Sequence, residues 1–224
     1  MTELRLTRRQ KEDPVLVVWV RFQDWILENS RVLLGVVGVA AALGIVSFLW
    51  LRTRADAEAK ASGQLAEAAA LYWRGDYGPL IQRANDIKRT YGGTKAATEA
   101  ERMLGDAYFW QGDFVKAKES YESYLKKTPA SSQLRPGVER SLAQALESQK
   151  QYAQAAEIYE RLAAVDGPRD VRGELYYAAG RAWQEAGNLA KAKPLYQKLA
   201  AEFGDTPSAG DAEIALGELE AQGK

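Results

Sequence analysis

Few side chains in this sequence belong to the types that carry out catalysis near neutral pH. The 224 residues contain neither His nor Cys. His is the usual general base and the commonest metal ligand, and Cys supplies thiolate nucleophiles, disulfides and thiolate metal ligands. Carboxylates remain, among them Glu99, Asp106, Glu147 and Glu174, but their place in the helical pattern puts them on solvated faces, where charge is expected. We therefore predict a protein that is not an enzyme and that has no cofactor and no metal site.

The charge balance excludes a further class of function. The chain has 30 basic and 30 acidic residues, so its formal net charge is zero. Such a chain exerts no overall electrostatic attraction on nucleic acid, and we predict no nucleic-acid partner. The absence of Cys also excludes a lipoprotein, whose lipid is attached to an N-terminal cysteine.

One segment is apolar enough to cross a membrane. Residues 32–51 contain no charge, and Ser47 is their only polar side chain. A helix of 20 residues is roughly 30 Å long, which matches the hydrocarbon core of a bilayer. We predict a transmembrane helix over 32–51.

The charges that flank this segment predict its orientation. Six basic residues precede it within the first 31 positions, and three follow it in the next 20. The positive-inside rule then favours a cytoplasmic tail at 1–13 and a translocated C-terminal domain. A cleaved signal peptide is the rival, since "ADAEA" at 55–59 has small residues at cleavage-site spacing, but the segments before it are longer than in a typical signal sequence. We expect an uncleaved anchor in a bacterial inner membrane, with the C-terminal domain in the periplasm.

A second amphipathic segment precedes the predicted span. In residues 14–31 the apolar side chains recur at helical spacing, and Trp19, Phe22 and Trp25 are among them. Aromatic rings beside a basic flank are typical of a membrane interface. We predict a juxtamembrane helix whose stripe lies in the bilayer surface; the alternative is a docking face for another membrane protein.

The rest of the chain repeats with a period of 37 or 38 residues. A small residue recurs in the same local context, at intervals of 37, 38, 37 and 37 residues: Ala68, Gly105, Ala143, Gly180 and Gly217. An Ala and a Tyr follow in the second half of three copies, and the tyrosines are Tyr121, Tyr159 and Tyr196. Each copy predicts two helices that pack closely at the small residue, with the tyrosine beside it. A single hairpin cannot bury its apolar face, so consecutive copies are expected to share one core.

These patterns predict an all-α protein. A single N-terminal transmembrane helix precedes an α-solenoid of about four helical hairpins with a capping helix. The solenoid is expected over residues 61–220, after a linker at 52–60.

The repeat resembles a known family. Leu104-Gly105, Tyr108, Ala117 and Tyr121, with Pro129 after them, stand at the positions that define a tetratricopeptide repeat. The period is three or four residues longer than usual in that family, and the family's first-helix tryptophan is replaced by Gln64, Glu101, Glu139 and Tyr176.

The layout of the whole chain is similar to a narrower group. A basic tail, the stretch with Trp25, Glu28 and Asn29, one span and loop-extended repeats resemble the YfgM-like family of bacterial inner-membrane proteins. Members of that family are ancillary subunits associated with the Sec translocon and with periplasmic chaperones. The resemblance implies partners of those kinds, besides the lipid bilayer.

Tetratricopeptide repeats generally bind peptides or proteins in a groove lined by the first helix of each hairpin, so the resemblance implies such a groove here. The positions that grip a C-terminal carboxylate in some members carry no Lys–Asn pair in this chain, so that mode of binding is not expected. A mixed aromatic and cationic surface is predicted instead. It consists of Tyr72, Trp73, Arg102, Phe109, Trp110, Arg140, Tyr177 and Arg181. Several of these side chains have an alternative role, which is to cover the neighbouring hairpin.

The leading hypothesis is therefore a membrane-anchored, non-catalytic interaction scaffold in the bacterial envelope, which assists secretion or folding of translocated proteins near the Sec translocon. Two alternatives stay open. One is an envelope adaptor in cell-wall, division or outer-membrane assembly. The other is an accessory subunit of a larger membrane complex, in which the span and the interfacial helix do the binding.

Overall fold

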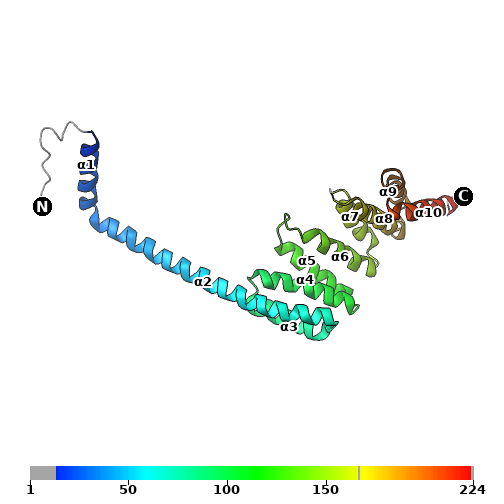
Figure 1. The fold of residues 1–224 in the computed structure, drawn as a ribbon, viewed down its shortest axis with the longest axis horizontal. Helices are drawn as coiled ribbons and strands as arrows, with labels where there is room; N and C mark the ends of the chain where they lie inside the picture. The colour runs from blue at the N-terminus through cyan, green and yellow to red at the C-terminus, as the bar shows by residue number, and fades with distance from the viewer. Residues whose placement is uncertain (1–13, 166, 223–224) are drawn as a thin grey trace. The chain divides into compact units, whose positions relative to one another are not determined.

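The computed structural model describes residues 14–165 and 167–222, and these residues form ten α-helices and no strand. The expected cytoplasmic tail, 1–13, lies outside them. The helices are α1 Pro14–Glu28, α2 Ser30–Arg74, α3 Tyr77–Tyr91, α4 Lys95–Trp110, α5 Phe114–Lys127, α6 Arg135–Ser148, α7 Tyr152–Ala163, α8 Arg169–Glu185, α9 Leu189–Glu202 and α10 Pro207–Gln222 (Figure 1). The all-helical prediction is confirmed for this part of the chain.

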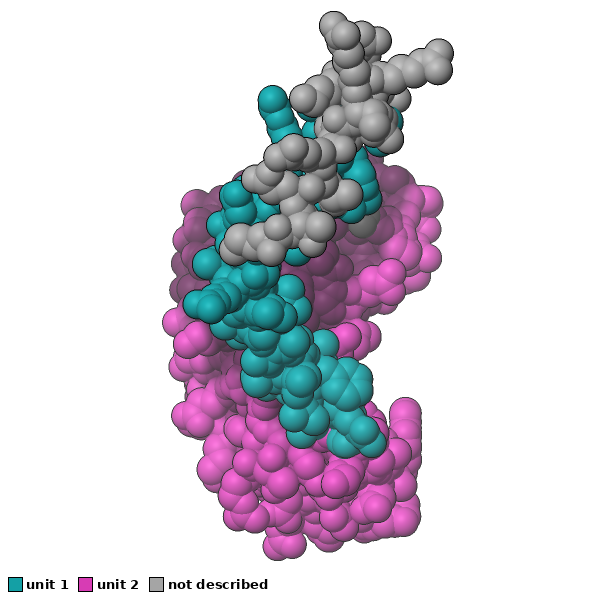
Figure 2. Space-filling view, turned by 90° about the vertical axis from the view of Figure 1, so that its left-hand side faces the viewer, with its two compact units in different colours: residues 1–56 teal, residues 57–224 magenta. Residues whose placement is uncertain are grey.

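The chain divides into two compact units, residues 1–56 and 57–224 (Figure 2). In the first unit, α1 carries the expected stripe on its surface. Trp19, Phe22 and Trp25 are each half exposed or more, and the ring centroids of neighbours along the stripe lie 6.3 and 6.4 Å apart. The stripe is thus an apolar surface that the protein itself does not cover.

Helix α2 contains the predicted span. An 18-residue window near its N-terminal end is long and apolar enough to cross a membrane, and none of that window is buried. The helix does not end where the span was expected to end. Residues 52–60, expected as a linker, are helical and belong to α2. They include three alanines and no Gly or Pro, so nothing in them breaks a helix.

The second unit contains the repeat. Its hairpins are residues 57–74 of α2 with α3, α4 with α5, α6 with α7, and α8 with α9, followed by α10. We call the first member of each hairpin, together with α10, the first helices, and α3, α5, α7 and α9 the second helices. Each turn within a hairpin contains one residue with positive φ, at Gly75, Gly112, Lys150 and Gly187. The left-handed conformation reverses the chain at the same place in all four copies.

Close contact at the small residues sets the register of the hairpins. A Cβ atom added at Gly105 would lie 2.4 Å from the ring of Tyr121, and one added at Gly180 would lie 2.6 Å from the ring of Tyr196. Ala143, at the equivalent position of the third hairpin, is fully buried. The predicted pairing of small residue and tyrosine is therefore confirmed.

Buried side chains form two clusters. One lies among α2, α3 and α4, and the other extends from α5 to α10. Tyr108 of α4 packs against both clusters. The copies therefore share an apolar interior that extends from one hairpin to the next, as a stacked repeat requires.

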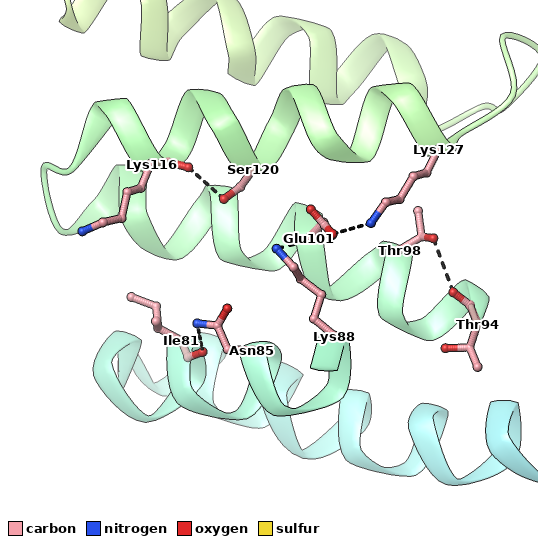
Figure 3. A network of polar contacts seen from close by, with 9 residues as sticks. All are labelled: Ile81, Asn85, Lys88, Thr94, Thr98, Glu101, Lys116, Ser120 and Lys127. Carbon is pink, nitrogen blue, oxygen red and sulfur yellow. Dashed lines mark hydrogen bonds and ion pairs between the residues drawn. The ribbon is translucent and has the colours of Figure 1, made fainter. Parts of the chain in front are cut away.

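Two of the positions that replace the family's first-helix tryptophan hold buried charges. The side chain of Glu101 is 1% exposed; its Oε1 lies 2.6 Å from Lys127 Nζ and 3.5 Å from Lys88 Nζ (Figure 3). Glu139 is paired in the same way with Arg135 and Arg161, at 3.0 and 2.6 Å. In both cases the first helix is tied through a carboxylate to basic residues, one of them on the second helix of its own hairpin. An ion pair thus takes the place of an aromatic contact.

Candidate functional site

Two surface hollows lie on the first-helix face of the repeat. The first, of about 500 Å³, lies between α2 and α4, and we call it the α2–α4 hollow. Three of the predicted groove residues line it, namely Tyr72, Trp73 and Arg102. The other lining residues are Ser62, Leu65, Ala66, Ala69, Glu99, Met103 and Asp106.

The second hollow, of about 750 Å³, lies at the C-terminal ends of the next three first helices, and we call it the α4–α8 hollow. Three more predicted residues line it, namely Phe109, Trp110 and Arg181. The remaining lining residues are Gln144, Glu147, Ser148, Tyr152 and Glu185. Six of the eight predicted residues thus line one of the two hollows.

Arg140 and Tyr177 do not line either hollow. Arg140 of α6 forms an ion pair with Glu174 of α8, at 3.0 Å. The ring of Tyr177 lies 5.9 Å from that of Tyr196 and is half-buried against the core. These two side chains join neighbouring helices. This is the alternative role named above for several of the predicted groove residues, which is to cover a neighbouring hairpin.

The arginines of the predicted aromatic and cationic surface are paired with carboxylates within the repeat. Arg102 pairs with Glu99 at 2.5 Å and with Asp106 at 2.6 Å. Arg181 pairs with Glu147 of α6 at 2.8 Å. The sequence contained a signal for these pairs. Arg102 lies three residues after Glu99 and four residues before Asp106, so all three share one helix face. The pairs between neighbouring first helices lie 34 residues apart.

The carboxylates of this face are less solvated than expected. Only 15% of the side chain of Asp106 and 15% of that of Glu147 is exposed. Burial raises the pKa of the Asp106 carboxyl above its ordinary value, although Arg102 and the Tyr121 hydroxyl oppose the change. Asp106 and Glu147 therefore belong to the polar interior of the first-helix face.

The hydroxyl groups of the core tyrosines form hydrogen bonds with polar side chains of the first helices. The hydroxyl of Tyr121 donates to Asp106 Oδ1 at 2.9 Å, and that of Tyr159 donates to Glu147 Oε2 at 2.9 Å. The hydroxyl of Tyr196 donates to Gln184 Oε1 at 3.0 Å, and burial raises its pKa to about 12. Each tyrosine thus fills the space beside its small residue and also fixes a polar side chain of the first helix.

No reactive constellation is present in the described part of the chain. Within it, no group of three or more acidic side chains is placed to hold a metal ion. Asp106 and Glu147 are each engaged by a guanidinium and a tyrosine hydroxyl. The arrangement offers a surface for contact, with aromatic rings exposed above paired charges.

Comparison with known proteins agrees with this geometry. The tetratricopeptide-repeat family model matches residues 99–131 and 174–206, which span α4 with α5 and α8 with α9. Both segments are therefore similar to tetratricopeptide repeats. The hairpins of α2 with α3 and of α6 with α7 have the same form in the structure but lie outside the matched residues.

Similar solved structures show the same fold. Two of them are crystal structures of nearly identical TPR-like repeats from a Podosopora anserina protein assigned as a kinesin light chain, one with a single substitution. They are 19% and 18% identical to this chain, with TM-scores of 0.59 and 0.58, and the matches cover 74% of this chain and 88% of theirs. At this identity the likeness concerns the fold alone. No curated protein matches the sequence significantly.

Tetratricopeptide repeats are in general non-catalytic scaffolds that bind other proteins, and no enzyme family is indicated for this chain. Two matched repeats within a stacked helical unit therefore support a role in protein interaction.

Proposed function

We propose that this chain is a membrane-anchored interaction scaffold of the bacterial envelope, whose first-helix face binds a partner protein. The observation that carries the proposal is the pair of hollows on that face, each with an exposed tryptophan above neutralised arginines. A rigid stack of helices holds these rings in place, so a partner meets a surface that is already formed.

The anchor is the apolar part of α2. Val32, Leu34, Val36 and most of the other large apolar side chains up to Leu51 are more than half exposed. A surface of this kind is stable in lipid and not in water. In the proposed arrangement, Trp19, Phe22 and Trp25 lie in the bilayer interface, the N-terminus is cytoplasmic and the repeats are periplasmic.

The pathway we propose rests on the resemblance of the chain to the YfgM-like family. A periplasmic scaffold beside the membrane is placed to receive proteins that emerge from the Sec translocon, together with periplasmic chaperones. The partners we propose are therefore translocon subunits, chaperones or their clients. An adaptor in cell-wall, division or outer-membrane assembly would use the same face with another partner.

A second candidate is an accessory subunit held in a membrane complex through α1 and the span. The observation in its favour is the uncovered apolar stripe of α1, which is continued by the exposed apolar side chains of α2. In that case the partner binds the anchor, and the repeats serve a different purpose.

One experiment separates these candidates. A reporter that is active only after export is fused after Lys224, in the native chain and in a version whose residues 15–51 are replaced by an unrelated single-span anchor. We expect the reporter to be active in both and the partner to co-purify with both, because the hollows lie outside the exchanged segment. An inactive reporter on the native chain would disprove the orientation. Loss of the partner on exchange of the anchor would favour the accessory subunit.

A further inference from the structure

Two tryptophans on the first-helix face are exposed without a role in packing. Trp73 is 83% exposed and Trp110 is 62% exposed, whereas Trp183 in the core is 3% exposed. Trp73 and Trp110 occupy equivalent positions in the first two hairpins. Each directly follows an aromatic residue that packs against the core, Tyr72 in the first hairpin and Phe109 in the second. Large aromatic side chains exposed at a surface are the ones that dominate binding energies when a partner covers them.

The hollows that contain these tryptophans have the same composition. Each contains a second aromatic ring beside the tryptophan, Tyr72 at 5.4 Å in one and Phe109 at 6.2 Å in the other. Each also contains one arginine and two carboxylates. The aromatic pairs therefore repeat with the helices on which they stand, whereas the charged residues of the two hollows come from different repeat positions.

Each hollow has one negative charge in excess. In the α2–α4 hollow, Arg102 is shared between the carboxylates of Glu99 and Asp106. In the α4–α8 hollow, Arg181 pairs with Glu147, and Glu185 forms no ion pair within residues 14–165 and 167–222. In the α4–α8 hollow, a positively charged ligand group would meet Glu185 without having to displace an arginine, and in the α2–α4 hollow it would meet two carboxylates that share a single arginine.

We propose that the two hollows are paired subsites for the Lys or Arg side chains of one polypeptide segment. The proposal rests on the proposed function and names the chemistry of the partner. A cation over a tryptophan face is attracted by the ring, and the excess carboxylate adds to this attraction. An acidic segment would be repelled from both hollows, and a wholly apolar one would gain nothing from the carboxylates.

The placement of the two tryptophans, Trp73 on α2 and Trp110 on α4, predicts a spacing in the ligand. Residues 57–74 of α2 pack with α4 in one apolar cluster, and packed helices lie about 8–10 Å apart. About three residues of an extended chain span that distance. The ligand is therefore expected to carry two basic residues about three positions apart.

The test uses the full-length chain in a non-ionic detergent and short fluorescent peptides with a Gly/Ser background. The peptides carry two Lys, two Glu or two Leu at that spacing, and binding is measured by fluorescence anisotropy. We expect the Lys peptide to bind at least about tenfold more tightly than the Glu peptide, since two charge reversals contribute. We expect Trp110→Leu, Trp73→Leu and Glu185→Gln each to weaken its binding by about fivefold. Glu157→Gln on the exposed surface of α7 is the control with the same change of charge and is expected to leave binding unchanged.

The possible results are distinguishable. The proposal for basic side chains would be overturned if the Glu peptide bound more tightly than the Lys peptide. It would also be overturned if the Leu peptide bound more tightly than the Lys peptide and kept this binding in Trp110→Leu. Either result would leave a first-helix scaffold in place. Equal weakening by Glu185→Gln and Glu157→Gln would show attraction by net charge alone and would also overturn it. If no peptide binds, or if none of the changes on the first-helix face alters the affinity for the peptides, both this inference and the proposed scaffold fail. Far-UV circular dichroism of each variant verifies that the helices are intact.

Discussion

Gly180→Leu is expected to lower the free energy of unfolding of residues 57–224 by about 3 kcal/mol, at the upper end of what overpacking usually costs. The reason is geometric. A Cβ atom at position 180 would lie 2.6 Å from Cε1 and 2.9 Å from Cδ1 of Tyr196, and leucine adds three further carbons. Tyr196 is 1% exposed and donates its hydroxyl hydrogen to Gln184, so the ring cannot move aside without loss of that bond.

Thermal unfolding followed by circular dichroism measures this effect, and a fall of about 6–12 °C in the melting temperature is expected for a unit of this size. Gly217→Leu is the matched control. Gly217 occupies the equivalent position in α10, but a Cβ atom there would have nothing within 4 Å. It should therefore change the melting temperature very little. Similar melting temperatures for Gly180→Leu and Gly217→Leu would show that the repeat register is misplaced.

Removal of both cations around Glu101 is the second change with a large expected effect. Lys88→Ala combined with Lys127→Ala would leave a carboxylate that is 1% exposed without a compensating charge. Breaking a buried pair in this way typically costs about 3–5 kcal/mol. Because both lysine side chains are 40% exposed or more, we expect the lower end, about 3 kcal/mol near neutral pH.

The pH dependence of this effect has a defined sign. Burial by itself raises the pKa of Glu101, but hydrogen bonds from Lys127 and Ser123 and the charges of the two lysines outweigh it, so the pKa is lowered in the folded protein. The pair therefore stabilises the fold above the pKa that Glu101 has in the unfolded chain, and this contribution is lost as the pH falls through the lowered pKa. In the double variant the two lysines no longer oppose the effect of burial, so its deficit should shrink as the pH is lowered and the carboxyl becomes protonated.

A third substitution supplies the control for the lysine variants. Adding Glu101→Gln removes the buried charge while nearly preserving its shape, and it should restore most of the lost stability in the double variant. Chemical denaturation of all the variants at two pH values makes the comparison. Further destabilisation by Glu101→Gln in that background would contradict the account of a buried charge held by two lysines.

The periodic features of this fold could be predicted from sequence because they depend on local contacts that recur. A small residue and a tyrosine sixteen positions later occur in three copies, and the structure brings each such pair together within one hairpin. The stripe of α1 was predictable for the same reason, since helical spacing alone places Trp19, Phe22 and Trp25 on one face.

The missed features depend on contacts between elements. Glu58 accepts hydrogen bonds from the backbone N–H groups of Lys95 and Ala96, at 2.7 and 3.0 Å, and so caps α4 from α2. Residues 52–60 contain no turn-forming residue, so no turn marks an end of the helix in this segment, and its expected role as a linker had no local support. The pairing of Arg181 with Glu147 spans two hairpins and becomes visible only when first helices are aligned with each other.

The buried glutamates are a further case. Glu101 and Glu139 depart from the family pattern at a core position, where a charge in a sequence ordinarily indicates a solvated face. Each is stabilised by cations that reach it from other parts of the repeat, Lys88 and Lys127 for the first and Arg161 for the second. Because no single helix contains the whole arrangement, only the three-dimensional structure reveals it.

The central claim is that a partner binds the first-helix face of the repeat, and site-specific photo-crosslinking in living bacterial cells tests it most directly. A photoreactive amino acid is placed at Ala66 in the α2–α4 hollow and at Gln144 in the α4–α8 hollow. Gln154 and Gln197 on the second helices serve as controls, and Val18 probes α1. The same crosslinked protein is expected from Ala66 and Gln144, and none is expected from the controls. The product should be lost when Trp73→Leu and Trp110→Leu are combined. Crosslinks to a protein from Val18 alone, unaffected by those two changes, would contradict the central claim.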